Sequence, residues 1–178
     1  MTVSNSAKVT ICLTNPKSPT NVGGVLRASG CFGAHEILYT GNRYNKAKKF
    51  STDTQNINDE IGIVHVEDFL AEKPDDIPLI CVDLVEGATP LPEFEHPESA
   101  FYVFGPEDGS IKQEVINKAD HVVFMPTKGS LNLAASVNVV LYDRVAKAEN
   151  TIENDELIIK SRDVNNRLTV NKRFKRKS

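Results

Sequence analysis

The chain has 178 residues, of which 40% are hydrophobic and 25% are charged, and its formal net charge is -3. This composition excludes a chain that is disordered in bulk and favours one globular domain with a substantial core. The N-terminus has no basic segment followed by an apolar run, and the most apolar late segment, 131–142, is too short to span a bilayer. We therefore expect a cytosolic protein.

Short apolar runs alternate with helical patterns along the chain. That alternation predicts an α/β sandwich around a mostly parallel sheet, since several of the runs are nearly continuous in apolar residues. The polar span 42–60 is expected to be a long surface loop in which a short helix fits. The expected strands are 8–14, 36–41, 62–66, 78–85, 101–105 and 121–126. The expected helices are 21–32, 67–73, 110–118 and 130–148.

The segment 14–33 leads from the first expected strand into the first helix. We expect this helix to begin near Asn21 as N-cap, with Gly23 and Arg27 on one outward face. Each glycine inside a helix costs about 0.5–1 kcal/mol relative to alanine, so the adjacent Gly23 and Gly24 need a reason. One reason is a site that a phosphate or ribose approaches closely beside a forked cation. The other is a close helix crossing with an ordinary surface arginine.

Two later turns leave the carboxyl ends of expected strands, the edge at which ligands bind in such folds. In FGPEDGSI, 104–111, glycines and a proline shape the bend, and Glu107 follows the strand. In MPTKGSLNLAASV, 125–137, Ser130 is expected to cap a helix, and Asn132 lies near the free backbone N–H groups of its first turn. Taken singly, each turn is also compatible with an ordinary strand-to-helix connection.

Several common site motifs are absent from the sequence. It holds no glycine-rich dinucleotide or P-loop motif, no His-Glu-x-x-His and no serine-hydrolase elbow. Cys12, Cys31 and Cys81 are far apart in apolar surroundings, which favours reduced buried thiols over disulfides. The four histidines have no metal-ligand spacing, so we expect no metal site.

Charge is distributed unevenly along the chain. Residues 160–178 hold eight Lys and Arg against one acidic residue, a formal charge of +7, so the preceding 159 residues carry -10. The last eight residues, NKRFKRKS, suit an arm that binds phosphate backbones. A solvated, solubilising terminus explains the same composition equally well. We expect a domain over 1–150 and a basic C-terminal tail over 151–178.

Together, NVGGVLRAS (21–29), FGPEDGSI (104–111) and MPTKGSLNLAASV (125–137) resemble, in order and spacing, the three motifs of the SpoU (TrmH-like) branch of the SPOUT RNA methyltransferases. The resemblance covers about residues 8–148. It implies a homodimeric enzyme that transfers a methyl group from S-adenosylmethionine to a ribose 2′-hydroxyl of tRNA or rRNA. We favour tRNA, because no large N-terminal RNA-binding extension is present. The implied fold is a three-layer α/β/α sandwich with a deep C-terminal trefoil knot, an exception to the rule that chains avoid knots.

The resemblance also implies roles for individual residues. Arg27 would act at the target ribose, and Asn21 would help to arrange that site. Arginine is a poor general base, because its guanidinium keeps its proton at neutral pH. Arg27 would therefore either take the hydroxyl proton with help from an RNA phosphate or stay charged and stabilise the developing alkoxide. Further polar positions of the active site are matched by Glu107, Ser130 and Asn132. The cofactor would touch Leu84, which lies outside any sharp motif, and Gly105, Met125, Leu131 and Leu133.

Two other functions are compatible with the same fold. One is a non-catalytic RNA-binding module, but binding alone would not need the whole polar set Asn21, Arg27, Glu107, Ser130 and Asn132. The other is base methylation by another SPOUT branch. The NVGGVLR and SLNL pieces favour the ribose branch.

Overall fold

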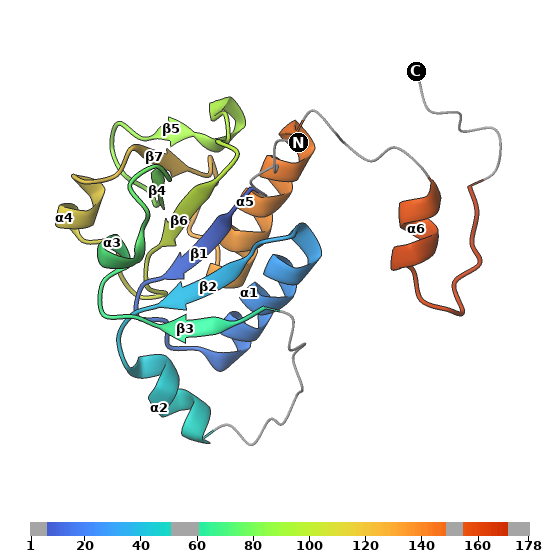
Figure 1. Cartoon of the computed structure of the whole chain (residues 1–178), viewed down its shortest axis with the longest axis horizontal. Helices are drawn as coiled ribbons and strands as arrows, with labels where there is room; N and C mark the ends of the chain where they lie inside the picture. The colour runs from blue at the N-terminus through green and yellow to red at the C-terminus, as the bar shows by residue number, and fades with distance from the viewer. Residues whose placement is uncertain (1–6, 51–60, 149–154, 171–178) are drawn as a thin grey trace, which may run out of the picture. The chain divides into compact units, whose positions relative to one another are not determined.

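The computed structural model describes residues 7–50, 61–148 and 155–170. The chain divides into two compact units, Met1–Ala148 and Glu149–Ser178. The first unit contains a seven-stranded sheet with helices packed on it, and the second contains the short helix α6 (Asp155–Ser161) (Figure 1).

The sheet of the first unit consists of β1 (Val9–Leu13), β2 (Glu36–Tyr39), β3 (Ile63–His65), β4 (Leu79–Val82), β5 (Thr89–Pro90), β6 (Ala100–Phe104) and β7 (His121–Phe124). Its strand order is β3-β2-β1-β6-β4-β7-β5, and all pairings between the described strands are parallel. β6 and β7 each lie between strands that come earlier in the chain. β1, β4 and β6 are buried along their whole length, as their continuous apolar runs predict.

Helices cover both faces of the sheet (Figure 1). One core cluster joins the sheet to α1 and α5 through residues such as Val25 and Val140, and a second joins it to α3 and α4 through Phe69 and Ile116. The expected three-layer α/β/α sandwich with a mostly parallel sheet is therefore confirmed, and the trefoil knot stays a prediction. The helices are α1 (Pro19–Phe32), α2 (Arg43–Phe50), α3 (Phe69–Glu72), α4 (Gln113–Ile116), α5 (Leu133–Lys147) and the 3-10 helix η1 (Leu91–Glu93).

The start of α1 differs from the expectation. The N-cap is Ser18, whose hydroxyl accepts a hydrogen bond from the Asn21 backbone N–H at 3.2 Å, and Pro19 occupies the first helical position. Asn21 as N-cap was wrong, because proline fits that first position and leaves the cap to the serine before it. The helix ends at Phe32, and its C-cap is Gly33, whose φ of 72° lies in the left-handed region.

The start of α5 also differs from the expectation, here by two residues. Asn132 is the N-cap, and its side-chain oxygen accepts a hydrogen bond from the Ala135 backbone N–H at 2.7 Å. Ser130 as cap was therefore wrong. The inward face was predicted correctly, since the residues expected to point into the core, Leu133, Val137, Val140 and Leu141, are all buried.

The glycine pair in α1 has a structural explanation at Gly24. A Cβ atom at this position would lie 2.8 Å from the Cβ of Ala134 in α5, well inside normal van der Waals contact. Glycine thus lets α1 and α5 cross closely. Of the two interpretations offered by the sequence, the helix crossing holds for Gly24.

The other end of α5 is anchored by a polar network. His96 contacts the Tyr102 hydroxyl at 2.6 Å and Asp143 at 2.9 Å, and Lys147 forms an ion pair with the same carboxylate at 2.7 Å. Arg144 donates to the backbone oxygens of residues 97 and 98. Burial lowers the pKa of His96 from its ordinary value, and the hydrogen bond to Asp143 opposes part of that shift. This network ties α5 to the segment that precedes β6.

Some secondary-structure elements and the exposure of one cysteine were not predicted. β5, η1 and α6 had no counterpart among the expected elements. The polar span 42–60 does begin with a helix, α2, but residues 51–60 lie outside the described part of the chain. Cys12 and Cys81 are buried, and burial raises the pKa of the Cys81 thiol to about 12, whereas Cys31 is exposed, contrary to expectation.

Candidate active site

A cavity of about 380 Å³ opens at the carboxyl ends of β4, β6 and β7. Its volume lies within the range of small-molecule sites, and its place follows the rule for parallel α/β sheets. Three turns meet there, one after each strand, and the first turns of α1 and α5 complete the wall. Its lining consists of Asn21, Val82, Asp83, Leu84, Phe104, Gly105, Pro106, Glu107, Gly109, Met125, Thr127, Ser130, Leu131, Asn132, Leu133 and Ser136.

Glu107 joins the turn after β6 to the start of α1. Its carboxylate accepts hydrogen bonds from the backbone N–H groups of Lys17 at 3.0 Å and Ser18 at 3.1 Å. The same carboxylate accepts from the side-chain amide of Asn21 at 3.3 Å. Burial raises the pKa of Glu107, but these hydrogen bonds outweigh it and leave the pKa below its usual value. An ionised carboxylate therefore holds α1 against the cavity.

The neighbouring Asp108 fixes the same turn from outside. Arg43, at the start of α2, donates to both of its carboxylate oxygens at 2.8 and 2.9 Å, and Lys17 approaches it at 3.2 Å. Hydrogen bonds from Arg43 and then Lys17 lower the pKa of Asp108. Arg43 also donates to the backbone oxygen of Asn15, after β1. The turn after β6 is thus linked to the turn after β1 and to α2.

The wall next to α5 is more exposed. Ser130, Leu131 and Asn132 are all exposed, and they lead into the buried Leu133. The Thr127 hydroxyl donates to the backbone oxygen of residue 129 at 2.6 Å, which closes this short loop on itself. The loop therefore presents backbone and small polar groups to the cavity opening.

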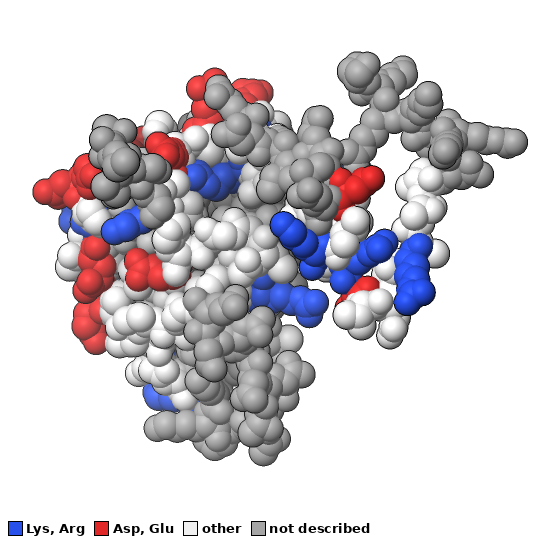
Figure 2. Space-filling view, turned by 45° about the vertical axis from the view of Figure 1, so that its right-hand side comes forward, with Lys and Arg blue, Asp and Glu red and all other residues white. Residues whose placement is uncertain are grey.

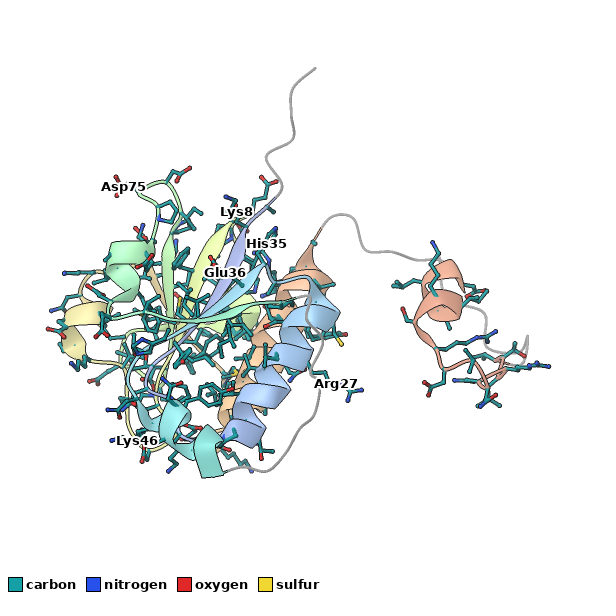
Figure 3. All side chains as sticks on the ribbon, turned by 60° about the horizontal axis from the view of Figure 1, so that its bottom comes forward. Lys8, Arg27, His35, Glu36, Lys46 and Asp75 are labelled. Carbon is teal, nitrogen blue, oxygen red and sulfur yellow. The ribbon has the colours of Figure 1, made fainter. Side chains whose placement is uncertain are left out.

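The structure brings nearly all the expected site residues together. Those that line the cavity are Asn21, Glu107, Ser130, Asn132, Leu84, Gly105, Met125, Leu131 and Leu133. The exception is Arg27, which is exposed on α1, outside the cavity lining, and has no hydrogen-bond or ion-pair partner among the described residues. Figure 3 shows its side chain extending outward from α1.

Sequence reasoning missed several lining residues, of which Asp83, Thr127 and Ser136 carry polar side chains. Asp83 had a usable signal, since it is the first polar residue after the buried run 79–82 and thus stands at the carboxyl end of a strand. Thr127 and Ser136 lie within the third motif, 125–137, but nothing else in the sequence marks either of them as a site residue.

Charges in the two units differ in sign. In Figure 2, acidic side chains are spread along the side of the first unit at the left of the view. In the second unit, Lys160 and Arg167 are exposed and Arg162 is half-buried, and the remaining basic residues of the expected tail, within 171–178, lie outside the described residues. Within the described ranges, none of the helices is long and apolar enough to cross a membrane, and no three potential metal ligands come together.

Comparisons with known proteins agree with the motifs. Among curated proteins, the tRNA (guanosine(18)-2′-O)-methyltransferase of Escherichia coli strain K12 is 22% identical over 148 residues, which are 80% of this chain and 65% of that protein. This chain thus spans less than two thirds of that relative.

Solved structures share the fold. One, described as giving structural insights into the 2-OH methylation of C/U34 on tRNA, has a TM-score of 0.64 at 23% identity and covers 79% of this chain and 91% of its own. Another is the SpoU methyltransferase AviRb from Streptomyces viridochromogenes in complex with AdoMet. Its TM-score is 0.60 at 20% identity, over 80% of this chain and 61% of its own.

The family assignment follows from the extent of one match. The sequence model of the SpoU rRNA Methylase family matches residues 8–142, which include all three motifs and every residue of the cavity lining. As the resemblance of those motifs implied, the chain belongs to the SpoU methylase family.

Proposed function

We propose that this chain is an S-adenosylmethionine-dependent RNA methyltransferase that methylates a ribose 2′-hydroxyl, with tRNA as the substrate. The observation that carries the proposal is the single cavity wall formed by the turns after β4, β6 and β7, where the second and third motifs meet Asn21 of the first. Two similar proteins support tRNA, because one is named as a tRNA 2′-O-methyltransferase and the other is described in terms of 2-OH methylation on tRNA. A non-catalytic RNA-binding module is the alternative that the experiments must exclude.

The cavity suits S-adenosylmethionine in size and in charge. Leu84, Leu131 and Met125 offer apolar surface, and the backbone of three turns offers hydrogen-bonding groups. Asp83 and Glu107 are the charged residues of this lining, which includes no Lys or Arg. Two carboxylates favour a cationic ligand, and the sulfonium of S-adenosylmethionine is positively charged. When bound, this cofactor supplies the methyl group. The AviRb structure with AdoMet supports the assignment by family.

Within the proposed site, Glu107 is a positioning residue. Its oxygens already accept three hydrogen bonds from the start of α1, so it holds Asn21 in place. The Asn21 amide nitrogen is engaged with Glu107, which leaves the amide oxygen to accept a hydrogen bond from a ligand hydroxyl. A fixed acceptor at this point orients the sugar for attack, and orientation supplies a large part of the acceleration in such displacements.

Arg27 requires a second copy of the chain. It does not line the cavity of its own chain, so we place it at the cavity of a partner in a homodimer. Val139, Tyr142 and Val145 lie on one side of α5, at 40%, 64% and 40% exposure, and Phe32 of α1 packs edge-on against Tyr142. Exposed apolar side chains grouped on one face favour a protein partner. In such a dimer the guanidinium of Arg27 binds the target ribose and its phosphate.

One experiment tests the activity. Purified protein is incubated with labelled S-adenosylmethionine and total RNA, and the modified nucleotide is mapped by nuclease digestion and mass spectrometry. We expect a 2′-O-methylated nucleoside in tRNA, and its loss in Arg27→Ala and Arg27→Lys, since lysine lacks the planar fork. A methylated base would indicate another SPOUT branch. RNA binding without methyl transfer would leave the non-catalytic module.

A mixing experiment tests whether Arg27 acts across a dimer. Two single variants are prepared separately, Arg27→Ala and Gly105→Val, and the valine side chain is expected to fill space at the cavity. The two inactive proteins are then mixed and refolded together. If Arg27 serves the partner, half of the dimers gain one intact site, and about a quarter of the wild-type activity returns. If Arg27 serves its own chain, the mixture stays inactive. A monomeric mass in light scattering at micromolar concentration would contradict the dimer itself.

A further inference from the structure

Asp83 lines the cavity and also accepts hydrogen bonds that join two separate segments of the cavity wall. It is the first residue after β4, and its carboxylate accepts two backbone hydrogen bonds, each at 2.8 Å. One comes from the adjacent Leu84, and the other comes from Ile111, 28 residues later in the chain. Asp83 therefore joins the end of β4 to the far end of the turn that follows β6.

Gly105 lies inside this connection. A Cβ atom there would lie 3.3 Å from the Ile111 backbone nitrogen and 3.4 Å from the Oδ2 atom of Asp83. The first residue after β6 is thus packed against the hydrogen bond that Asp83 makes. Ile111 is also buried in the core cluster that joins the sheet to α3 and α4. The turn 105–111 is therefore held at both of its ends.

We propose that Asp83 is a positioning residue for the cofactor. Its carboxylate closes the turn 105–111 onto β4 and so sets the distance between the Leu84 and Gly105 walls of the cavity. This inference rests on the proposed function, which supplies the cofactor. A carboxylate does this better than an amide, because it accepts from both N–H groups at once, whereas an asparagine must turn its own NH₂ group toward one of them.

The chain offers a matched control at the opposite end of the same strand. Asp120 accepts a hydrogen bond from the Leu79 backbone N–H at 2.7 Å, at the start of β4 and outside the cavity lining. Asp83→Asn and Asp120→Asn therefore make the same change, from a carboxylate to an amide with one acceptor oxygen, at opposite ends of one strand, but only Asp83 lies at the cavity. Asp83→Ala removes both contacts of Asp83 and extends the series.

The experiment measures hydrogen exchange and cofactor affinity on the full chain. We expect faster amide exchange across 105–112 in both Asp83 variants and not in Asp120→Asn. Calorimetry should show affinity for S-adenosylmethionine weakened about tenfold or more in Asp83→Asn, further in Asp83→Ala, and unchanged in Asp120→Asn. The KM for the cofactor should rise while the KM for RNA stays constant, which a general loss of stability would not produce.

The outcomes separate the two proposals. Wild-type protein that binds no S-adenosylmethionine would overturn the proposed function and this inference with it. Wild-type protein that binds the cofactor, with Asp83 variants that exchange and bind as Asp120→Asn does, would overturn the role of Asp83 alone. Faster exchange across 105–112 with unchanged cofactor affinity would also overturn it, since the turn would then move without consequence for the cavity.

Discussion

The crossing of α1 and α5 gives a quantitative prediction at Gly24. The alanine substitution would bring two Cβ atoms to 2.8 Å, whereas carbon atoms in contact are about 3.5–4.0 Å apart. The other carbon belongs to Ala134, a short side chain that cannot turn away. The helices must therefore separate by roughly 1 Å at this point, and overpacking of this kind costs about 1–3 kcal/mol.

Helix propensity acts in the opposite direction. Alanine is favoured over glycine inside a helix by about 0.5–1 kcal/mol, so Gly24→Ala should lower the free energy of unfolding by a net of about 0–2.5 kcal/mol, centred near about 1 kcal/mol. For a chain of this size the central value corresponds to a fall in Tm of about 2–4 °C. Thermal and urea denaturation followed by circular dichroism measure both quantities.

Gly30 is the matched control on the same helix. A Cβ atom at Gly30 would have Ile61 as its nearest neighbour at 3.8 Å, an ordinary contact, so Gly30→Ala should raise Tm by a few degrees, roughly 1–4 °C. The double variant Gly24→Ala with Ala134→Gly restores the space between the helices and should recover stability relative to Gly24→Ala alone. A Tm that rises in Gly24→Ala as it does in Gly30→Ala would refute the idea that this contact sets the helix crossing.

Three further results are expected. Asn132→Ala removes the α5 cap and should cost about 0.5–2 kcal/mol of unfolding free energy, which Asn132→Ser should largely restore, as denaturant titration can measure; equal stability of both variants would contradict the cap. The lowered pKa of Glu107 means that its stabilisation is present above the ordinary carboxyl pKa of about 4.3 and is lost as pH falls through the folded value. The Tm difference between wild type and Glu107→Gln should therefore shrink below about pH 4, and a constant difference would argue against the ionised form. Removing 160–178, which hold eight Lys and Arg, should weaken RNA binding and flatten its salt dependence, and an unchanged salt slope would show that the tail makes no phosphate contacts.

The strands and the buried faces of the helices could be predicted because burial leaves a direct pattern in the sequence. Ile11 and Ile80 belong to continuous apolar runs, and Val137 and Val140 recur at the spacing of a helix face. β5 could not be found in this way, because a two-residue strand has no period of its own. β5 forms because it pairs with β7, and that pairing depends on the tertiary structure rather than on the local sequence.

Helix starts were less predictable because each region offered two capping residues. Ser18 and Asn21 both precede the apolar face of α1, and the decisive signal was local, since Pro19 marks the first helical position. At α5, where Ser130 was the expected cap, no proline marks the first helical position. The correct cap, Asn132, follows from where the chain leaves the loop after β7, and that path depends on the sheet.

At the cavity, the sequence predicted which residues belong to the site but not which role each of them has. The sequence placed Glu107 in the expected site, but a carboxylate in a ligand cavity can bind a ligand, orient another residue or take a proton. The structure distinguishes these roles by the partners of the carboxylate, which are the start of α1 and the Asn21 amide. Those partners lie 86 to 90 residues away in the chain, so no local pattern encodes them. Asp83 is a similar case outside any motif, because its hydrogen bond to Ile111 depends on β6 lying beside β4 in the sheet. In this fold the residues that shape the cavity are brought together by the spatial order of the strands, and such residues are found by tracing contacts across neighbouring strand ends.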